Sequence, residues 1–161
     1  MTTHTAHNIH KEKVLQDHLV AQLVAHEGYE RRTAKTDYDR ALAMDRALVL
    51  RFVQSTQAEA WDKLAAQYSA SAEDTFFKQL EKALKDRGLL DVLRKGIKIV
   101  PGIPFSLCYF RPASGLEPKR LAEYQANILS VMDEVEYSQK HGGRIDVVLF
   151  VNGLPVVSLE A

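Results

Sequence analysis

The chain has 161 residues, of which 46% are hydrophobic and 26% charged, and this is enough apolar material for one folded domain. Its 21 basic and 21 acidic side chains give a formal net charge of zero, whereas an independent nucleic-acid-binding domain is usually clearly basic. The single cysteine, Cys108, excludes a disulfide within the chain and suits a reducing compartment. No apolar run approaches the about 20 residues of a membrane helix and no signal peptide is recognisable, so we expect a cytoplasmic protein with no membrane partner.

The first half of the chain is predicted to be helical. We expect residues 1–8, which are polar, to form a disordered N-terminus. Residues 9–27 carry apolar side chains at helical spacing and stop at Gly28, while residues 29–41 have no clear period and indicate a loop. Further helices are expected at about 45–54 with Asp45 as a candidate cap, at 56–68, and at 72–87 before Gly88.

The second half is rich in strand signals. Short strands are predicted at 96–100 and 105–110, then a helical turn or two at 117–127, and longer strands at 128–137, 144–151 and 154–160. The Asn152-Gly153 pair between the last two strands is a strong hairpin signal. The predicted fold class is therefore α+β, with helices flanking a mixed β-sheet and a helical N-terminal half.

Two carboxylates stand out in the last hairpin. Asp146 lies in an otherwise apolar strand, and Glu160 ends the strand that follows. Carboxylates within apolar strands are costly unless they are paired, hydrogen-bonded or bound to a metal. Two acids in a hairpin are structural or solvated more often than catalytic, so their relative placement decides whether they form a site.

The register of the hairpin determines that placement. A plain two-residue loop at Asn152-Gly153 would set Asp146 opposite Leu159, and the two acids would point to opposite faces. A three-residue loop, or one bulge, sets Asp146 opposite Glu160. We predict the second arrangement, because two converging hard carboxylates would suit Mg²⁺ or Mn²⁺.

An ordered set of short motifs resembles the N-terminal nuclease domain of the restriction subunit of type I restriction-modification enzymes, in the PD-(D/E)xK nuclease group. Asp146, an apolar strand, Asn-Gly-Leu-Pro and Glu160 match its central pattern. Similar motifs stand elsewhere in the same order: Leu23 to Tyr29, Tyr38-Asp39, Phe52 to Gln57 with Trp61, Leu93 to Gly96, Arg111-Pro112, Tyr124, Asn127 and Tyr137-Ser138.

This resemblance implies a restriction-endonuclease-like core over residues 9–161 and Mg²⁺-dependent hydrolysis of double-stranded DNA. It implies that Asp146 and Glu160 are catalytic metal ligands and that Glu12, on the first helix, reaches the same metal. It also implies ATP-driven translocation by separate motor domains, and specificity and methyltransferase subunits as partners.

The sequence departs from the family pattern at two places. Ile145 stands where the group has proline, and Glu160 is followed only by Ala161, so the motif lysine two positions after the glutamate is not in this sequence. That lysine helps to position and activate the attacking water in the family. We therefore expect a fragment of a larger subunit with little or no nuclease activity by itself.

Other polar side chains allow more than one interpretation. The cationic residues Arg94, Lys95 and Lys98 could contact DNA phosphates nonspecifically, or form a solvated face. Gln57 and Trp61 lie four residues apart on one helix and favour packing over chemistry. The alternative to an enzyme is a DNA-guiding or subunit-docking module with the same fold and no catalysis.

Overall fold

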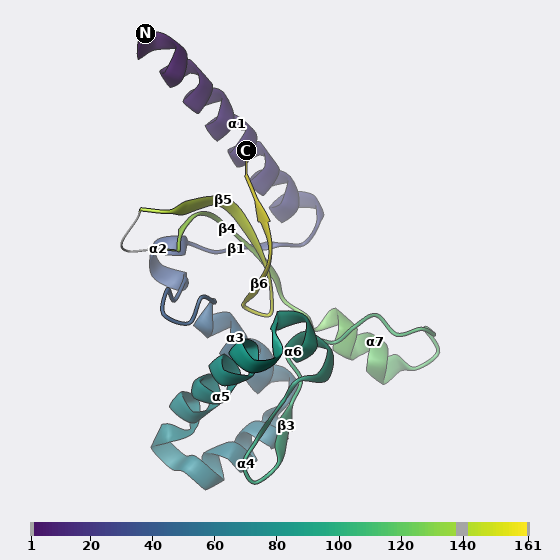
Figure 1. Ribbon diagram of the computed structural model, residues 1–161. Helices are drawn as coiled ribbons and strands as arrows, with labels where there is room; N and C mark the ends of the chain where they lie inside the picture. Colours follow the sequence, from purple (N-terminus) through teal and green to yellow (C-terminus); the bar gives the residue numbers. More distant parts are fainter. Residues whose placement is uncertain (1, 138–141, 161) are drawn as a thin grey trace. The chain divides into compact units, whose positions relative to one another are not determined.

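The computed structural model describes residues 2–137 and 142–160 and divides the chain into two compact units (Figure 1). Unit 1 combines Met1–Ala47 with Ile128–Ala161, and unit 2 is Leu48–Asn127. The sequence predicted one domain from residue 9 onward. In the structure, unit 2 is inserted in the sequence between the two segments of unit 1. The two carboxylates of interest, Asp146 and Glu160, both belong to unit 1.

Unit 1 is built on a four-stranded sheet in the order β1-β4-β5-β6. The short β1 (Glu30–Arg31) runs parallel to β4 (Leu129–Glu136), and the pairs of β4 with β5 (Arg144–Val151) and of β5 with β6 (Leu154–Leu159) are antiparallel. The sheet is therefore mixed, as predicted, and its three long strands fall within one residue of the predicted limits.

Helices cover both faces of this sheet, which confirms the predicted α+β class. Helix α1 (Thr2–His26) buries Val20 against Val131 and Val147 on one face. The short α2 (Ala34–Asp37) and the adjacent Tyr38 pack on the other face, against a buried cluster of Met132, Val135, Val148 and Phe150. Both β1 and α2 lie in the stretch 29–41 that was predicted to be loop.

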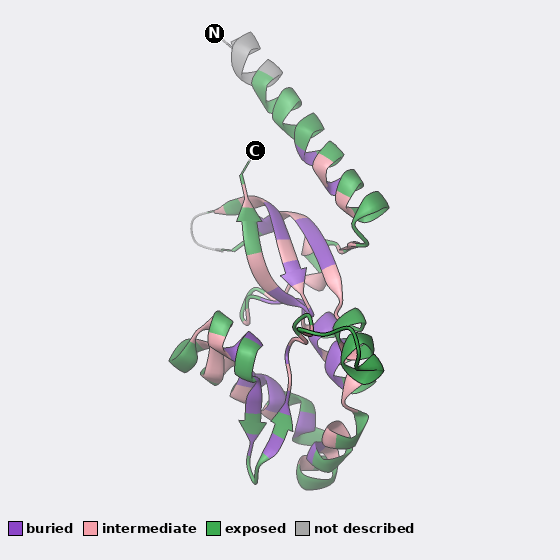
Figure 2. Ribbon diagram, turned by 90° about the vertical axis from the view of Figure 1, so that its right-hand side faces the viewer, coloured by how far each residue is buried: buried purple, intermediate pink, exposed green. Residues whose placement is uncertain are grey.

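Helix α1 begins at Thr2, within the stretch 1–8 that the sequence predicted to be a disordered N-terminus. No proline or glycine lies between Thr2 and His26 to stop the helix. The helix ends just before Gly28, whose φ of 72° is a left-handed conformation typical of helix ends. Its first half extends beyond the sheet and exposes Ile9, Val14 and Leu15 (Figure 2).

Unit 2 is mainly helical and packs around buried aromatic rings. Its elements are most of α3 (Arg46–Thr56), α4 (Ala58–Tyr68), a 3₁₀ turn (Ser69–Ser71), α5 (Ala72–Arg87), α6 (Leu89–Lys95), a hairpin of β2 (Ile97–Ile99) and β3 (Ile103–Phe105), and α7 (Pro118–Gln125). Phe76 packs edge-on against Phe77, Phe105 and Trp61. Helix α5 matches its prediction, whereas α6 was not predicted.

The predicted strand at 105–110 is wrong beyond its first residue, since β3 ends at Phe105. After Phe105, side chains and not a neighbouring strand form hydrogen bonds with the backbone N–H and carbonyl groups. Gln57 bonds both the N–H and the carbonyl of Ser106, and Asn127 does the same for Tyr109. A local alternation of apolar residues cannot reveal such partners, because they are distant in the sequence.

Candidate functional site

The β5–β6 hairpin turns tightly at Asn152-Gly153. Val151 pairs with Leu154 across this turn, and both turn residues have positive φ, 51° and 83°, as a type I′ turn requires. The side chain of Asn152 is fully buried and accepts a hydrogen bond of 2.6 Å from the backbone N–H of Ile128. The predicted hairpin is confirmed, with the two-residue loop and not the three-residue one.

A β-bulge next to the turn restores the register that the acids need. Phe150 pairs with Pro155 and Leu149 with Val157, so Val156 is the extra residue. Beyond the bulge the pairs are Val148 with Ser158 and Val147 with Leu159. The same register, extended by one position, sets Asp146 opposite Glu160. Asp146 is half-buried in β5, and Glu160 is exposed directly after β6.

The strand on the other side of β5 is irregular at the level of Asp146. Asp133 pairs with Val147 and Val135 with Ile145, so Glu134 lies opposite Asp146 between these pairs. Glu134 has a φ of 51°, a left-handed conformation that costs a non-glycine residue about 1–3 kcal/mol. Side-chain alternation breaks at the same level, since Met132 and Val135 pack into one cluster although they are three residues apart.

Cations from other elements surround the carboxylates of β4. Lys13 Nζ of α1 lies 3.2 Å from Asp17 and 3.7 Å from both Asp133 and Glu134. The hydrogen bond with Asp17, followed by the charges of Glu134 and Asp133, raises the pKa of the Lys13 ammonium against the lowering effect of desolvation. The ion pairs of Lys13 with Asp133 and Glu134 join α1 to the sheet beside the row that carries Asp146.

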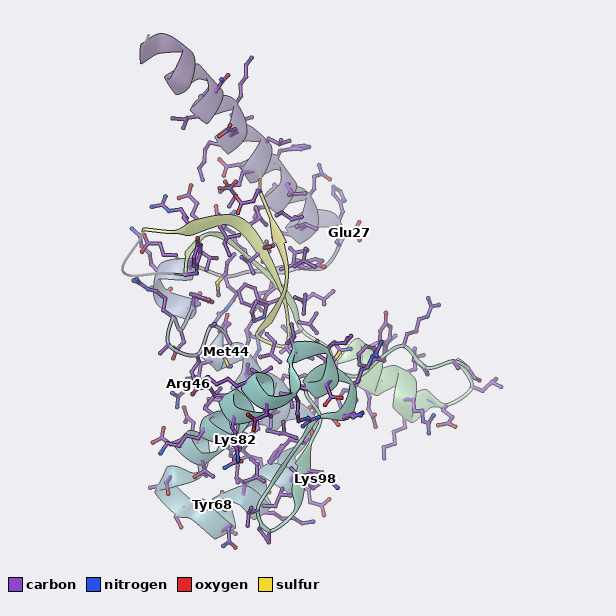
Figure 3. The ribbon with its side chains drawn as sticks, in the orientation of Figure 1. Glu27, Met44, Arg46, Tyr68, Lys82 and Lys98 are labelled. Atoms are coloured by element: carbon purple, nitrogen blue, oxygen red, sulfur yellow. The ribbon has the colours of Figure 1, made fainter. Side chains whose placement is uncertain are left out.

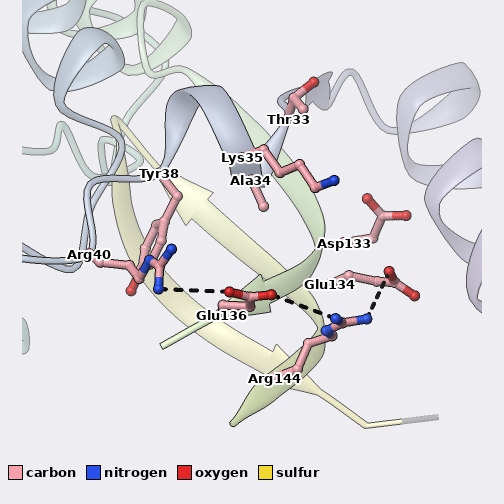
Figure 4. A pocket seen from close by; sticks show the side chains of 9 residues that line it. All are labelled: Thr33, Ala34, Lys35, Tyr38, Arg40, Asp133, Glu134, Glu136 and Arg144. Atoms are coloured by element: carbon pink, nitrogen blue, oxygen red, sulfur yellow. Dashed lines mark hydrogen bonds and ion pairs between the residues drawn. The ribbon is translucent and has the colours of Figure 1, made fainter. Parts of the chain in front are cut away.

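A pocket of about 470 Å³ lies over this end of the sheet, lined by α2 and the adjoining ends of β4 and β5 (Figure 4). Arg40 pairs with Glu136 at 3.7 Å, and Arg144 pairs with Glu136 at 3.6 Å and with Glu134 at 3.3 Å. Lys35 and Asp133 also line the pocket, so its lining has as many cationic as anionic side chains. The pocket therefore has no excess positive charge with which to attract a phosphate.

The family model of the type I restriction enzyme R protein N-terminus matches residues 9–161, which is nearly the whole chain. The chain belongs to this family. No curated protein and no solved structure matches the sequence significantly. The resemblance identified from the short motifs is thereby confirmed.

The R-protein family pattern suggested Glu12 as a third metal ligand. Glu12 is exposed on α1, one helical turn before the buried Gln16. Among the described residues, no group of three or more histidine, cysteine, aspartate or glutamate side chains is arranged to hold a metal ion. The strand register relates Asp146 to Glu160. The role of Glu12 as a third metal ligand stays a prediction.

The R-protein motif around Gln57 and Trp61 has a packing role in unit 2. The Gln57 side chain forms hydrogen bonds of 2.6 Å and 2.9 Å with the backbone of Ser106, and Trp61 packs against Phe76 and Phe105. This agrees with the interpretation that favoured packing over chemistry. The motif joins the start of α4 to the end of β3.

Replacing Gln57 by alanine is expected to destabilise unit 2 by about 1–3 kcal/mol, because it leaves a part-buried backbone N–H and carbonyl without partners. The measurement is the free energy of unfolding from urea titration followed by circular dichroism. Gln67→Ala, at an exposed glutamine of α4, the helix that Gln57 precedes, is the matched control. Equal stability of the two variants would contradict the structural role of Gln57.

The cationic residues predicted to contact DNA lie in unit 2. Arg94 and Lys95 end α6, and Lys98 is exposed on β2 between two buried isoleucines (Figure 3). Lys95 pairs with Asp91 at 3.2 Å. A hydrogen bond from Arg87, and a second from Lys95, lower the pKa of the Asp91 carboxyl. DNA binding by these residues stays a prediction.

None of the helices in the described ranges is both long enough and apolar enough to cross a membrane.

Proposed function

We propose that this chain is the endonuclease module of a type I restriction R subunit and hydrolyses phosphodiester bonds of double-stranded DNA with Mg²⁺ or Mn²⁺. Membership of the R-protein family supports the proposal. The structural observation that carries it is the bulged register of β5 and β6, which extends to place Asp146 opposite Glu160.

The donor set fits the cation. Carboxylate oxygens are the ligands that Mg²⁺ and Mn²⁺ take in proteins. The Cβ atoms of residues directly opposite each other on antiparallel strands are about 4.5–5.5 Å apart, so the Asp146 and Glu160 carboxylates can reach one ion. When bound, the metal would offset charge on the phosphate and activate water for attack on phosphorus.

The two acids would contribute differently to this site. Asp146 is half-buried in β5, and the next residue of that strand, Val147, is buried under α1, so we expect the backbone that carries Asp146 to be well fixed. Glu160 lies at the exposed end of the hairpin, where a DNA strand can approach. A preorganised group stabilises charge that develops in the transition state without reorganising during the reaction.

The proposal extends to the assembled enzyme. There the module would act on DNA drawn in by ATP-driven motor domains, beside specificity and methyltransferase subunits. Arg94, Lys95 and Lys98 would contact phosphates without reading sequence, because such contacts position DNA and do not specify bases.

A plasmid-nicking assay tests the catalytic proposal. We expect the 161-residue chain to cleave supercoiled DNA near background in Mg²⁺, since the family's motif lysine is not in the sequence. A lysine appended directly after Ala161 is expected to raise cleavage by about 100-fold, the scale of one general acid–base contribution. Glu160→Gln in the lysine-extended chain should return cleavage to background, and Glu27→Gln, at an exposed glutamate of unit 1, should not.

The alternative, a DNA-guiding module without catalysis, predicts different results. In that case the lysine-extended chain would shift DNA in a gel without cutting it, and removal of Arg94, Lys95 and Lys98 would weaken the shift. That pattern would overturn the nuclease proposal.

A further inference from the structure

Helix α7 and the loop before it project from the rest of unit 2 (Figure 1). None of the eight residues of α7 is buried. Helices this short take most of their stability from packing, because isolated helices below about 12–15 residues are marginal in water. Leu121 and Tyr124 lie three residues apart on one face of α7 and are 37% and 39% exposed. The helix therefore carries an apolar face that the described part of the chain leaves accessible.

A second exposed aromatic ring lies next to the end of α7. Phe110 is 53% exposed, whereas the ring of the preceding Tyr109 packs on Phe52 at 5.6 Å between ring centroids. The Asn127 side chain accepts a hydrogen bond from the N–H of Tyr109 and donates to the carbonyls of both Tyr109 and Tyr124. Because one amide group reaches both carbonyls, the segments that carry Phe110 and Tyr124 lie side by side.

Three cationic side chains belong to the same two segments. Arg111 follows Phe110, and Lys119 and Arg120 lie in the first turn of α7. Arg111 and Lys119 are exposed, and neither forms an ion pair with another described residue. Arg120 pairs with Glu117 at 2.9 Å, but both side chains are more than half exposed. Such exposed pairs contribute little, so the Arg120 guanidinium can change its partner at small cost.

Three of the short R-protein motifs meet in this region: Arg111-Pro112, Tyr124 and Asn127. Packing within unit 2 accounts for Asn127, which joins the two segments through its hydrogen bonds. It does not account for Arg111 and Tyr124, whose side chains are exposed. Exposed polar and aromatic side chains on a scaffold that holds them in place are typical of a binding surface.

We propose that Phe110, Arg111, Lys119, Arg120 and Tyr124 form a docking surface for single-stranded DNA, here called the α7 surface. Aromatic rings stack on unpaired bases of any sequence, and cations pair with the phosphates between those bases. In an intact duplex the faces of the bases are covered by their neighbours and cannot reach the rings. The inference goes beyond the proposed hydrolysis and does not depend on the metal site.

Size and charge favour a nucleic-acid strand over a protein as the occupant. A helix of eight residues is about 12 Å long, and a stable protein–protein interface takes about 20–30 residues from each side. The α7 surface is smaller than that. Two of its cations are without an ion pair among the described residues, although the chain as a whole has no net charge. A polyanion with flat, apolar bases complements both features.

The first test compares DNA strands that differ only in their bases. The 161-residue chain is titrated into a fluorescein-labelled oligo(dT) of about 12 nucleotides, or into an abasic strand of equal length, and anisotropy is measured in EDTA. We expect oligo(dT) to bind at least about tenfold more tightly, which is the lower range of the contribution of one stacked base. Equal affinities would show that only phosphates are contacted and would overturn the proposal.

The second test assigns the difference to the two rings. Phe110→Ala and Tyr124→Ala are each expected to weaken oligo(dT) binding by about tenfold and to leave binding of the abasic strand unchanged. Arg111→Ala should weaken both strands alike. Tyr137→Ala, at an aromatic residue of unit 1 that is 58% exposed, is the matched control and should change neither. Losses of equal size in the control and in the ring variants would overturn the assignment.

A cross-linking experiment on the wild-type chain decides the question if a ring variant fails to fold. An oligonucleotide that carries 5-iodouracil is irradiated in the complex, and the attached peptides are identified by mass spectrometry. We expect cross-links at Phe110 or Tyr124. Cross-links confined to other residues would overturn the α7 surface as the site of contact.

These outcomes are separable from the fate of the nuclease proposal. Asp146→Asn should bind oligo(dT) as the wild type does, because EDTA removes the metal in either case. Removal of Arg94, Lys95 and Lys98 should weaken oligo(dT) and the abasic strand alike and keep the difference between them. A chain that binds neither strand but self-associates through Phe110 and Tyr124 in sedimentation would overturn this inference and assign the α7 surface to a protein contact.

Discussion

Replacing Asp146 by asparagine is expected to weaken Mn²⁺ binding to unit 1 by about 100-fold or more. The amide keeps the shape of the carboxylate in β5 but loses the charge that a hard cation requires. Groups that only support a metal ligand change affinity by about 10–100-fold when mutated, so loss of a ligand itself should reach at least the upper end. Isothermal titration calorimetry of Mn²⁺ into the 161-residue chain measures this change.

Two further observations make the metal experiment decisive. Asp62→Asn, at an exposed aspartate of α4 in unit 2, should bind Mn²⁺ as the wild type does. Mn²⁺ at 100 times its Kd should also stabilise the wild-type fold by about 2.7 kcal/mol, because it binds only the folded state, and this stabilisation should vanish in Asp146→Asn. Equal affinity and equal stabilisation in both aspartate variants would show that Asp146 is not a ligand.

Replacing Phe150 by alanine is expected to lower the free energy of unfolding by about 3–5 kcal/mol, the usual cost of emptying a phenylalanine site in a packed core. Phe150 is fully buried in β5, lies in the cluster with Met132 and Val148, and meets Tyr38 edge-on at 6.3 Å between ring centroids. Urea denaturation followed by circular dichroism and by the amide resonances of unit 1 gives the value.

Leu15→Ala is the control for this loss, since Leu15 belongs to the same unit and is 60% exposed. An exposed leucine on α1 should change stability by no more than about 0.5 kcal/mol. Similar losses in the two variants would mean that the α2-side cluster is not the core of unit 1. Because Phe150 and Asp146 share one strand, the phenylalanine variant should also bind Mn²⁺ more weakly wherever it is partly unfolded.

Local sequence signals were sufficient where the structure depends on near neighbours. Helix α5 follows from apolar spacing and Gly88, and the Asn152-Gly153 turn follows from two residues that accept positive φ. The strands β4, β5 and β6 follow from their alternation. The ordered motifs also identified the family, because each motif is a short stretch of sequence that can be recognised without knowledge of the fold.

The placement of the candidate site required the tertiary structure. Sequence left two registers open for Asp146 and Glu160, and only the bulge at Val156, formed against β5, selects between them. The left-handed Glu134 and the buried Gln16 amide, whose nitrogen has no hydrogen-bond partner among the described residues, were not predicted, since both depend on contact between α1, β4 and β5. The bulge forms within one hairpin but has no signature in the local alternation, and the burial of Gln16 depends on strands more than a hundred residues away in the sequence. For that reason this sequence determined its elements and its family, while packing decided which side chains meet.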